Sequence, residues 1–308
     1  MFQDYLLYAT DVQTQYAFRV VHLSHLVQQA AERHKLSGPS ALLLSEVLTC
    51  GVLMASVLET EERVNLRIQC GSDFTLASET SCHAQTRGYF ESTPSSEVVA
   101  RLLRGEPADA SVIVRTLRSL PGTTRLTEGV TQSRFESIEQ VVNEHLHQSF
   151  QSKLRLKVGA WFAGDHGLGA VTDLRAFGVI YLELPGLDPL VEKKLHDHID
   201  ALKGFRELGA LTDDPDTLVQ ELVPDLVRPV NSILPVWQCT CSMASVESML
   251  LTLDPRELVS MASAKEPLDI LCHYCGTNYH IDPERLNSLS LSVAAGARDG
   301  SGNKSQPN

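Results

Sequence analysis

The sequence predicts an α+β protein with a mixed N-terminal core domain, a helical linker and a small cysteine-rich C-terminal domain. Before about residue 186, segments of alternating polar and apolar residues are interleaved with segments whose apolar residues recur at helical spacing. A long amphipathic stretch follows, and two close pairs of cysteines come after it. At 308 residues the chain is long enough for about two domains, each with its own apolar core.

The N-terminal segments predict two helices. Residues 20–34 place apolar side chains at helical spacing, and "LSGPSA" at 36–41 ends that helix and supplies caps for the next one. Residues 41–58 are apolar enough to suggest a membrane span, but they are barely long enough and hold Glu46 near the middle. We therefore expect a buried helix.

Strands and one further helix complete the predicted core. In residues 63–70 and 153–162, apolar residues alternate with charged or polar ones, which is typical of half-buried strands. Residues 110–117 and 177–186 are further strand candidates, and residues 135–150 form a helical pattern between strands. The core domain is expected to span residues 1–186.

The linker is predicted over residues 187–235. Leucine and isoleucine recur at three and four spacing from residue 187 to 227, interleaved with charged residues, and a second short helix starts near "DDPDTLVQELV". On pattern alone, this is an ordinary surface helix packed on the domain.

Composition limits the partners and the compartment. The 38 acidic residues outnumber the 26 basic ones, and the net charge of -12 repels phosphate backbones and anionic lipids. We therefore expect no nucleic-acid and no membrane partner. The first 18 residues lack the basic and apolar regions of a secretory signal, because Asp4 and Asp11 interrupt them, so a cytoplasmic location is expected.

Seven cysteines remain to be assigned in a reducing cytosol, where clustered thiols are more often metal ligands or redox groups than structural bridges. Cys50 and Cys70 fall on apolar positions and are predicted to be small buried hydrophobes. Nothing in the sequence assigns a role to Cys82. The remaining four are Cys239, Cys241, Cys272 and Cys275.

These four cysteines form the pattern C-x-C-x30-C-x2-C. Tetrahedral zinc takes four thiolates, commonly as two close pairs, so we expect one Zn²⁺ per chain. Gly276 after the second pair can adopt the positive φ of a knuckle turn. Between the pairs, "VESMLLTLDPRELVSMA" predicts one or two short helices, with Asp254 and Pro255 opening the second. A zinc-binding domain over 236–288 and a disordered tail over 289–308 are expected.

Other assignments of this region are weaker. His273 and His280 lie nearby, but four cysteines already complete a zinc shell. A deaminase needs an H-x-E element and a nucleotide-binding loop needs G-x-x-x-x-G-K-[ST], and neither occurs. "GDHGLG" at 164–169 has the wrong glycine order for a dinucleotide fingerprint and predicts a hairpin loop. No nucleophile–base arrangement is visible, so no enzymatic activity is expected.

The zinc site has two interpretations at this point. A static clamp is the common case and suits a constitutive structural zinc module that serves as a protein-binding adaptor. The other interpretation is a switch, because about 10–16 kcal/mol of apparent zinc-binding free energy is the folding free energy of such a module. An oxidant that oxidises the thiolates removes the metal ligands and therefore also unfolds the module. Each pair could close on itself, Cys239 with Cys241 and Cys272 with Cys275.

The segments "WQCTCS" and "LDPRELVSMASAKEPLDILCHYCGTNYHID" resemble the zinc-binding region of the heat-shock protein 33, or 33-kDa chaperonin, family of redox-regulated molecular chaperones. "DYLLYAT", "ERVNLRIQC" and "RGYF" fall in the family's order and spacing, and "HQSFQSKLRLKVG" and "AFGVIYLELPG" look like its later core segments. The resemblance covers nearly the whole chain up to about Ile281. It departs over 91–134, where glycines are few and "TRLTEGVTQ" stands in place of a Tyr-x-Gly pattern.

The resemblance implies an ATP-independent holdase that binds unfolding client proteins under oxidative stress. In the reduced state, zinc on the four cysteines would keep the protein inactive. Oxidants would form two disulfides, Cys239 with Cys241 and Cys272 with Cys275, and release the metal. The linker would then lose its docking, apolar surface would be uncovered and a homodimer would form.

Overall fold

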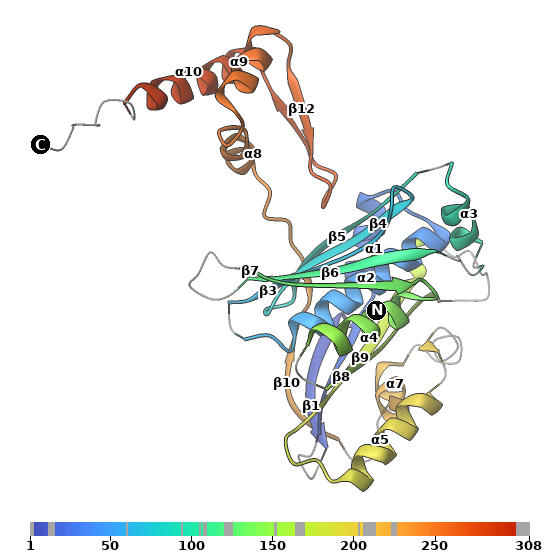
Figure 1. The fold of residues 1–308 in the computed structure, drawn as a ribbon. Coiled ribbons are helices and arrows are strands. Elements are labelled where there is room, and N and C mark those ends of the chain that lie inside the picture. Colours follow the sequence, from blue (N-terminus) through green and yellow to red (C-terminus); the bar gives the residue numbers. More distant parts are fainter. Residues whose placement is uncertain are drawn as a thin grey trace, which may run out of the picture. The chain divides into compact units, whose positions relative to one another are not determined.

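A computed structural model shows two compact units, Met1–Gln238 and Cys239–Asn308 (Figure 1). Helices and strands are mixed in both, which confirms the predicted α+β class. The structure describes residues 3–11, 16–59, 61–93, 95–104, 106, 110–119, 126–150, 153–163, 170–202, 204–205, 214–222 and 227–299. The predicted hairpin loop at 164–169 lies outside these residues.

The core unit contains two sheets. Sheet A has the strand order β10-β1-β2-β9-β8 and is antiparallel throughout. Its strands are β1 (Tyr5–Asp11), β2 (Tyr16–Leu23), β8 (Leu154–Phe162), β9 (Leu174–Glu183) and β10 (Val227–Ile233). Sheet B has the order β11-β5-β4-β3-β6-β7. Its strands are β3 (Arg63–Cys70), β4 (Phe74–Ser81), β5 (Gln85–Ser92), β6 (Ser111–Ser119), β7 (Leu126–Arg134) and β11 (Val236–Trp237).

Helix α2 (Gly38–Ala55) contacts strands of both sheets and forms the centre of the main apolar core. It packs so closely on sheet A that a Cβ at Gly178 of β9 would lie 2.8 Å from Thr49 and 2.9 Å from Leu53. This is the one described helix long and apolar enough to cross a membrane, and 67% of it is buried inside the protein. The expectation of a buried helix agrees with this position.

Other helices complete the core unit. Helix α4 (Ile138–Ser149) lies on β7 and β8, and α1 (His25–Arg33) packs on α2. The core unit also contains helix α3 (Glu97–Leu103) and a short 3₁₀ turn, η1 (Val171–Asp173).

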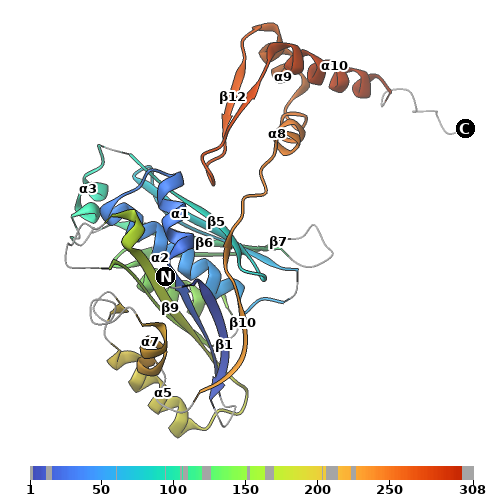
Figure 2. The same cartoon turned by 180° about the vertical axis from the view of Figure 1, so that it is seen from behind.

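The outer face of sheet A, turned away from α2, is apolar and covered by two helices. Helices α5 (Pro189–Ala201) and α7 (Pro215–Leu222) lie along this sheet (Figures 1 and 2). Together they form a second apolar core. From the strands this core takes Ala9, Tyr16, Phe18, Val20, Trp161, Phe177, Val179 and Tyr181, and from the helical segment Leu195, Ile199, Phe205 and Leu222.

These helices confirm the amphipathic pattern predicted after residue 187. Leu195 and Ile199 are each 1% exposed and face the sheet, whereas Leu190, at the start of the stripe, is 72% exposed. The sequence did not predict β10 and β11. These strands form because β1 and β5 each offer an open sheet edge: β10 pairs antiparallel with β1, and β11 pairs parallel with β5.

The prediction of a helix from residue 20 is wrong at its start, because residues 20–23 belong to β2 and the helix begins at His25. The carboxylate of Asp4 sets this boundary. Its Oδ1 accepts hydrogen bonds from the backbone N–H groups of Ser24 (2.6 Å) and His25 (2.9 Å), and its Oδ2 accepts one from Leu26 (2.7 Å). The buried carboxylate of the residue before β1 therefore satisfies N–H groups at the start of α1 from about 20 residues away, which local sequence does not reveal.

The divergent segment contains regular structure. Residues Leu126–Arg134 form β7, an edge strand of sheet B that pairs with β6 along its whole length. A Cβ at Gly129 would lie 2.9 Å from the Ser149 side chain, so this glycine allows α4 to approach the strand. Residues 120–125, which include the start of "TRLTEGVTQ", lie outside the described residues.

His145 is a fully buried imidazole between α4 and sheet B, 2.8 Å from Thr116 Oγ1 and 3.0 Å from Thr131 Oγ1. Burial lowers its pKa from 6.5 to about 4. Below about pH 6.5 His145 becomes protonated in the unfolded chain but stays neutral in the folded chain. We therefore expect the free energy of unfolding to fall by up to about 3 kcal/mol as the pH drops from 6.5 to 4. Urea unfolding across this range measures it.

In a His145→Gln variant, this part of the pH dependence should disappear, whatever the cost at neutral pH. His147→Gln, an exposed change on the same helix, is the control and should retain the wild-type profile. An unchanged slope in His145→Gln would assign the acid sensitivity to other groups.

The C-terminal unit consists of helices α8 (Met243–Leu250), α9 (Pro255–Ser263) and α10 (Pro283–Asp299) and a hairpin of β12 (Leu268–Leu271) and β13 (Asn278–Ile281). The expected helix opened by Asp254 and Pro255 is confirmed, because the Asp254 side chain accepts a hydrogen bond from the Arg256 N–H. The small core of this unit contains Val246, Leu250, Leu258, Ile281, Leu286 and Leu289.

The expectation of a disordered tail from residue 289 does not agree with α10, which continues to Asp299. The reason is burial: Leu289 is 6% exposed in the small apolar core, so the helix is held beyond the point where composition turns polar. Residues 300–308 lie outside the described residues.

Candidate metal centre and redox site

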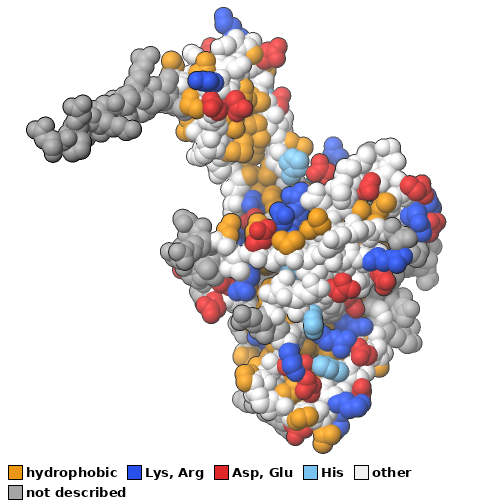
Figure 3. Space-filling view, in the orientation of Figure 1, with side chains coloured by type: hydrophobic (Ala, Val, Ile, Leu, Met, Phe, Trp, Pro, Cys, Tyr) orange, Lys and Arg blue, Asp and Glu red, His pale blue; other side chains and the backbone are white. Residues whose placement is uncertain are grey.

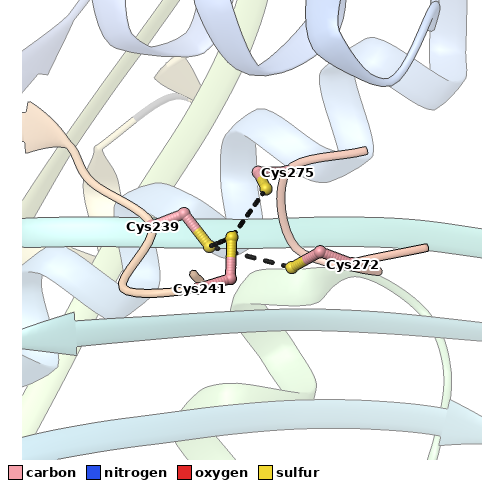
Figure 4. Close-up of side chains that lie close together, drawn as sticks. All are labelled: Cys239, Cys241, Cys272 and Cys275. Atoms are coloured by element: carbon pink, nitrogen blue, oxygen red, sulfur yellow. Dashed lines mark hydrogen bonds between the residues drawn. The ribbon is translucent and has the colours of Figure 1, made fainter. Parts of the chain in front are cut away.

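Cys239, Cys241, Cys272 and Cys275 meet in one cluster of thiols, as their spacing predicted (Figure 4). The Sγ atom of Cys239 lies 3.2 Å from that of Cys241 and 3.8 Å from that of Cys272. The Sγ atoms of Cys241 and Cys275 are 3.3 Å apart, and all four lie within 4.8 Å of one another. None of the four cysteines forms a disulfide.

Two chain segments supply the thiols. The first pair lies on the segment between β11 and α8, where Ser242 caps α8 immediately after Cys241. The second pair lies in the turn between β12 and β13, where the N–H groups of Cys275 and Gly276 both donate to the Cys272 carbonyl. Gly276 has φ +69°, the left-handed conformation expected of the knuckle turn. The hairpin therefore places two sulfurs on one side of a single turn.

The geometry and the charge of this cluster fit Zn²⁺. Four sulfurs at about 2.3 Å from a tetrahedral ion lie about 3.8 Å from one another, close to the observed separations. Without a cation the pKa values of Cys241 and Cys275 lie far apart. Burial and neighbouring thiols raise the pKa of Cys241 to about 12, although the Tyr279 hydroxyl opposes them. At Cys275 burial also raises the pKa, but hydrogen bonds from Thr277 and the other thiols outweigh it and bring the pKa to about 6. Because adjacent thiolates repel one another, only a bound cation allows all four to ionise together.

Tyr279 is a further residue of this centre, and the sequence reasoning did not identify it. Its hydroxyl donates a hydrogen bond of 3.0 Å to the Sγ of Cys241. Tyr279 lies on β13 opposite Ile270, so the pairing of the hairpin holds the phenol beside the sulfur. Its place four residues after Cys275, at the start of an alternating strand, is the one sequence signal that could have pointed to it.

Tyr279→Phe is expected to lower zinc affinity by about tenfold, because the hydrogen bond orients Cys241 and stabilises its negative charge. Competition with a chromogenic chelator measures the affinity, and Tyr89→Phe in the core unit is the matched control. Equal affinities in the two variants would show that the hydroxyl does not tune the centre.

The other sequence candidates lie elsewhere. His280 is not in the cluster: its Nδ1 lies 2.9 Å from Asp269 Oδ1, and its pKa is raised by that carboxylate. His273 is exposed and is also outside the cluster. Cys50 and Cys70 are buried, as expected, and Cys82 is partly exposed in the core unit.

A second group of possible metal ligands, Glu183, Glu192 and His196, lies on the core unit. The ammonium of Lys153 lies 3.0 Å from Glu183 and 2.5 Å from Glu192, so a cation is already present among these carboxylates. This group is therefore an ion-pair network.

Comparison with known proteins agrees with the fold. The family model described as Hsp33 protein matches residues 4–282. A 33 kDa chaperonin of Geobacter sp. (strain M21) is 24% identical over 302 residues, which are 94% of this chain and 98% of the relative. That of Trichodesmium erythraeum (strain IMS101) is 25% identical over 283 residues, 86% of each chain. The crystal structure of the 33 kDa chaperonin (heat shock protein 33 homolog) of Thermotoga maritima aligns with a TM-score of 0.74 and 20% identity, covering 96% of this chain and 100% of that one.

An α+β core joined to a small unit with four clustered cysteines defines a class of two-unit proteins with a cluster of thiols that could hold a metal ion. Because the family model covers most of the chain and the fold matches, this chain belongs to the Hsp33 family of chaperones. The family resemblance read from the cysteine region and the core segments is confirmed.

Proposed function

We propose that this chaperone is a redox-regulated, ATP-independent holdase that binds unfolding proteins under oxidative stress. The observation that carries the proposal is the cluster of four thiols in a small unit of a chain that belongs to the Hsp33 family. The chain would be inactive while Cys239, Cys241, Cys272 and Cys275 hold one Zn²⁺. The cytoplasm is the compartment in which this reduced state persists.

The activating step is oxidation of the four thiols. Two thiols give two electrons and two protons to one molecule of hydrogen peroxide, which forms one disulfide and two molecules of water. Two such reactions consume all four metal ligands. The C-terminal unit then loses the metal-binding free energy on which its fold depends, on the order of 10 kcal/mol.

We propose the disulfides Cys239 with Cys241 and Cys272 with Cys275. The reduced geometry permits other pairs, since the Sγ of Cys241 lies 3.3 Å from that of Cys275 and 3.2 Å from that of Cys239. Chain connectivity favours the proposed pairs, because two residues of one motif stay close after the unit opens, whereas a cross pair must close a loop of about 30 residues. The Cys239–Cys241 ring is small, which should raise its reduction potential and make it the more reversible bond.

The client surface is proposed to be the outer face of sheet A. This face buries large apolar side chains, among them Phe18, Phe177 and Tyr181, against the linker helices α5 and α7. If the linker over 187–235 loses its docking when the redox-switch domain over 236–288 unfolds, an apolar patch is uncovered, and patches of this kind bind non-native chains. A homodimer is expected to form in the active state.

A constitutive structural zinc module that acts as a protein-binding adaptor is the alternative, since most closed four-thiolate sites are structural. It predicts that zinc stays bound under oxidant. An enzymatic role of the same site is not proposed, because four thiolates leave no open coordination position.

The decisive experiment compares the reduced, zinc-loaded protein with protein treated with peroxide under mild heating. Zinc release, thiol trapping and suppression of aggregation of a thermally unfolding client are measured on the same samples. The proposal predicts one zinc per reduced chain, loss of free thiols with zinc release, and suppression only after oxidation. Equal suppression by both forms would remove the switch, and zinc retained under oxidant would favour the adaptor.

A further inference from the structure

Strand β8 presents a row of three cations to the linker helix α5. Lys153 precedes the strand, and Arg155 and Lys157 follow at alternate positions, so all three side chains lie on the outer face of sheet A. The Nζ of Lys153 lies 2.5 Å from Glu192, and a guanidinium nitrogen of Arg155 lies 2.5 Å from Asp200. The Nζ of Lys157 lies 3.5 Å from the backbone carbonyl of Leu202, at the C-terminal end of α5.

Helix α5 has a matching flank. Glu192, His196 and Asp200 recur every four residues and form one edge of the helix, beside the buried stripe that contains Leu195 and Ile199. Glu192 and Asp200 contact the row of cations, and His196 lies 2.7 Å from Glu183 at the end of β9. Figure 3 shows charged and histidine side chains gathered over this part of the core unit. Helix α5 therefore contacts sheet A through an apolar stripe and through an acidic flank.

We propose that sheet A selects client segments by charge: once α5 has left, the uncovered face binds amphipathic helical segments that carry acidic side chains along one flank. The apolar side chains of β2 and β9 contact the apolar stripe of the client segment, and Lys153 and Arg155 pair with its acidic flank. Helix α5, which covers this face, has the same combination of apolar stripe and acidic flank as the proposed client segment. The inference rests on the proposed function and adds the chemistry of the preferred client.

The cations border the apolar face and do not lie within it. The side chains of Lys153 and Arg155 are 67% and 40% exposed, so their interactions are screened by salt. Each exposed pair contributes little alone, but an acidic flank gains two attractions where a basic flank meets two repulsions. The expected preference is about tenfold in affinity at low ionic strength, and it decreases as salt is added.

The test uses two fluorescent peptides with the same apolar positions, one with glutamate and one with lysine at the flanking positions that correspond to Glu192 and Asp200. Anisotropy titrations measure their binding to the oxidised full-length chain in low and high salt. The double variant Lys153→Glu with Arg155→Glu should invert the preference. Arg101→Glu with Arg115→Glu is the matched control, because it changes the net charge equally on exposed residues outside sheet A.

Stronger binding of the acidic peptide by wild type and control, with inversion in the β8 variant, supports the inference. Equal affinities, a preference for the basic peptide, or a preference that the β8 variant retains would overturn it. Suppression of aggregation without binding of either peptide would also overturn it, while the holdase function stands. If oxidised protein neither binds peptide nor suppresses aggregation, the proposed function itself fails.

Discussion

Replacing Ile199 with aspartate is expected to make the reduced, zinc-loaded protein suppress client aggregation without oxidant. Ile199 is 1% exposed against the outer face of sheet A. Removing such a side chain costs about 2–5 kcal/mol, and the new carboxylate adds an unpaired charge inside an apolar core. This loss should exceed the free energy that holds α5 on the sheet, so α5 should undock. Light scattering of a heated client measures the effect.

The control for this variant lies on the same helix. Leu190 is 72% exposed, so Leu190→Asp should leave the reduced protein inactive. Zinc content should be unchanged in both variants, because the four cysteines lie in the other unit. Reduced Ile199→Asp protein that remains inactive while α5 becomes sensitive to protease would show that undocking does not expose the client surface.

Removal of the metal from the reduced protein should unfold the C-terminal unit and leave the core unit folded. In the part of the small unit that the structure describes, the apolar core contains six buried residues, and a core of this size supplies only a few kcal/mol of stability, so a disulfide or a metal adds decisively to it. The core unit has two apolar cores of its own and uses none of the four cysteines. We expect a chelator, or the Cys275→Ser variant, to abolish the helical signal and protease resistance of α8, α9 and α10.

Limited proteolysis with mass spectrometry separates the two units, because a folded core unit resists cleavage under the same conditions. Cys82→Ser is the matched cysteine control and should retain both zinc and the folded C-terminal unit, since Cys82 lies outside the cluster. A metal-free C-terminal unit that stays protected would mean that its apolar core suffices without the ion.

Elements with a strong local pattern were predicted well. Residues Leu154–Phe162 and Arg63–Cys70 form strands because one face of each is apolar, and Gly38–Ala55 forms a helix because a long, mostly apolar run follows a turn with capping residues. Elements whose stability comes from distant partners were missed. Strand β10 depends on an open edge of β1, and β11 on an open edge of β5.

In the candidate site, too, residues with a local sequence pattern were predicted and a residue whose role depends on tertiary contacts was missed. The four cysteines were predicted, because thiol pairs at this spacing have few other uses in a reducing compartment. Tyr279 was not predicted, because its role depends on the register of the hairpin, which sets its hydroxyl 3.0 Å from Cys241. A tyrosine in a strand has many possible roles, and only the three-dimensional contact selects one.

The sequence alone determined the α+β class, the cluster of four cysteines and the family resemblance, because each depends on residue types at short or fixed spacing. It also showed an amphipathic helix after residue 187, which pattern alone assigned to an ordinary surface, and a half-buried strand with Lys153, Arg155 and Lys157 on one face. Only the tertiary structure decided that these two surfaces meet. Periodicity shows which face of an element is apolar or charged, but the partner of that face is set by long-range packing, and here the packing places the linker helix over the apolar face of sheet A.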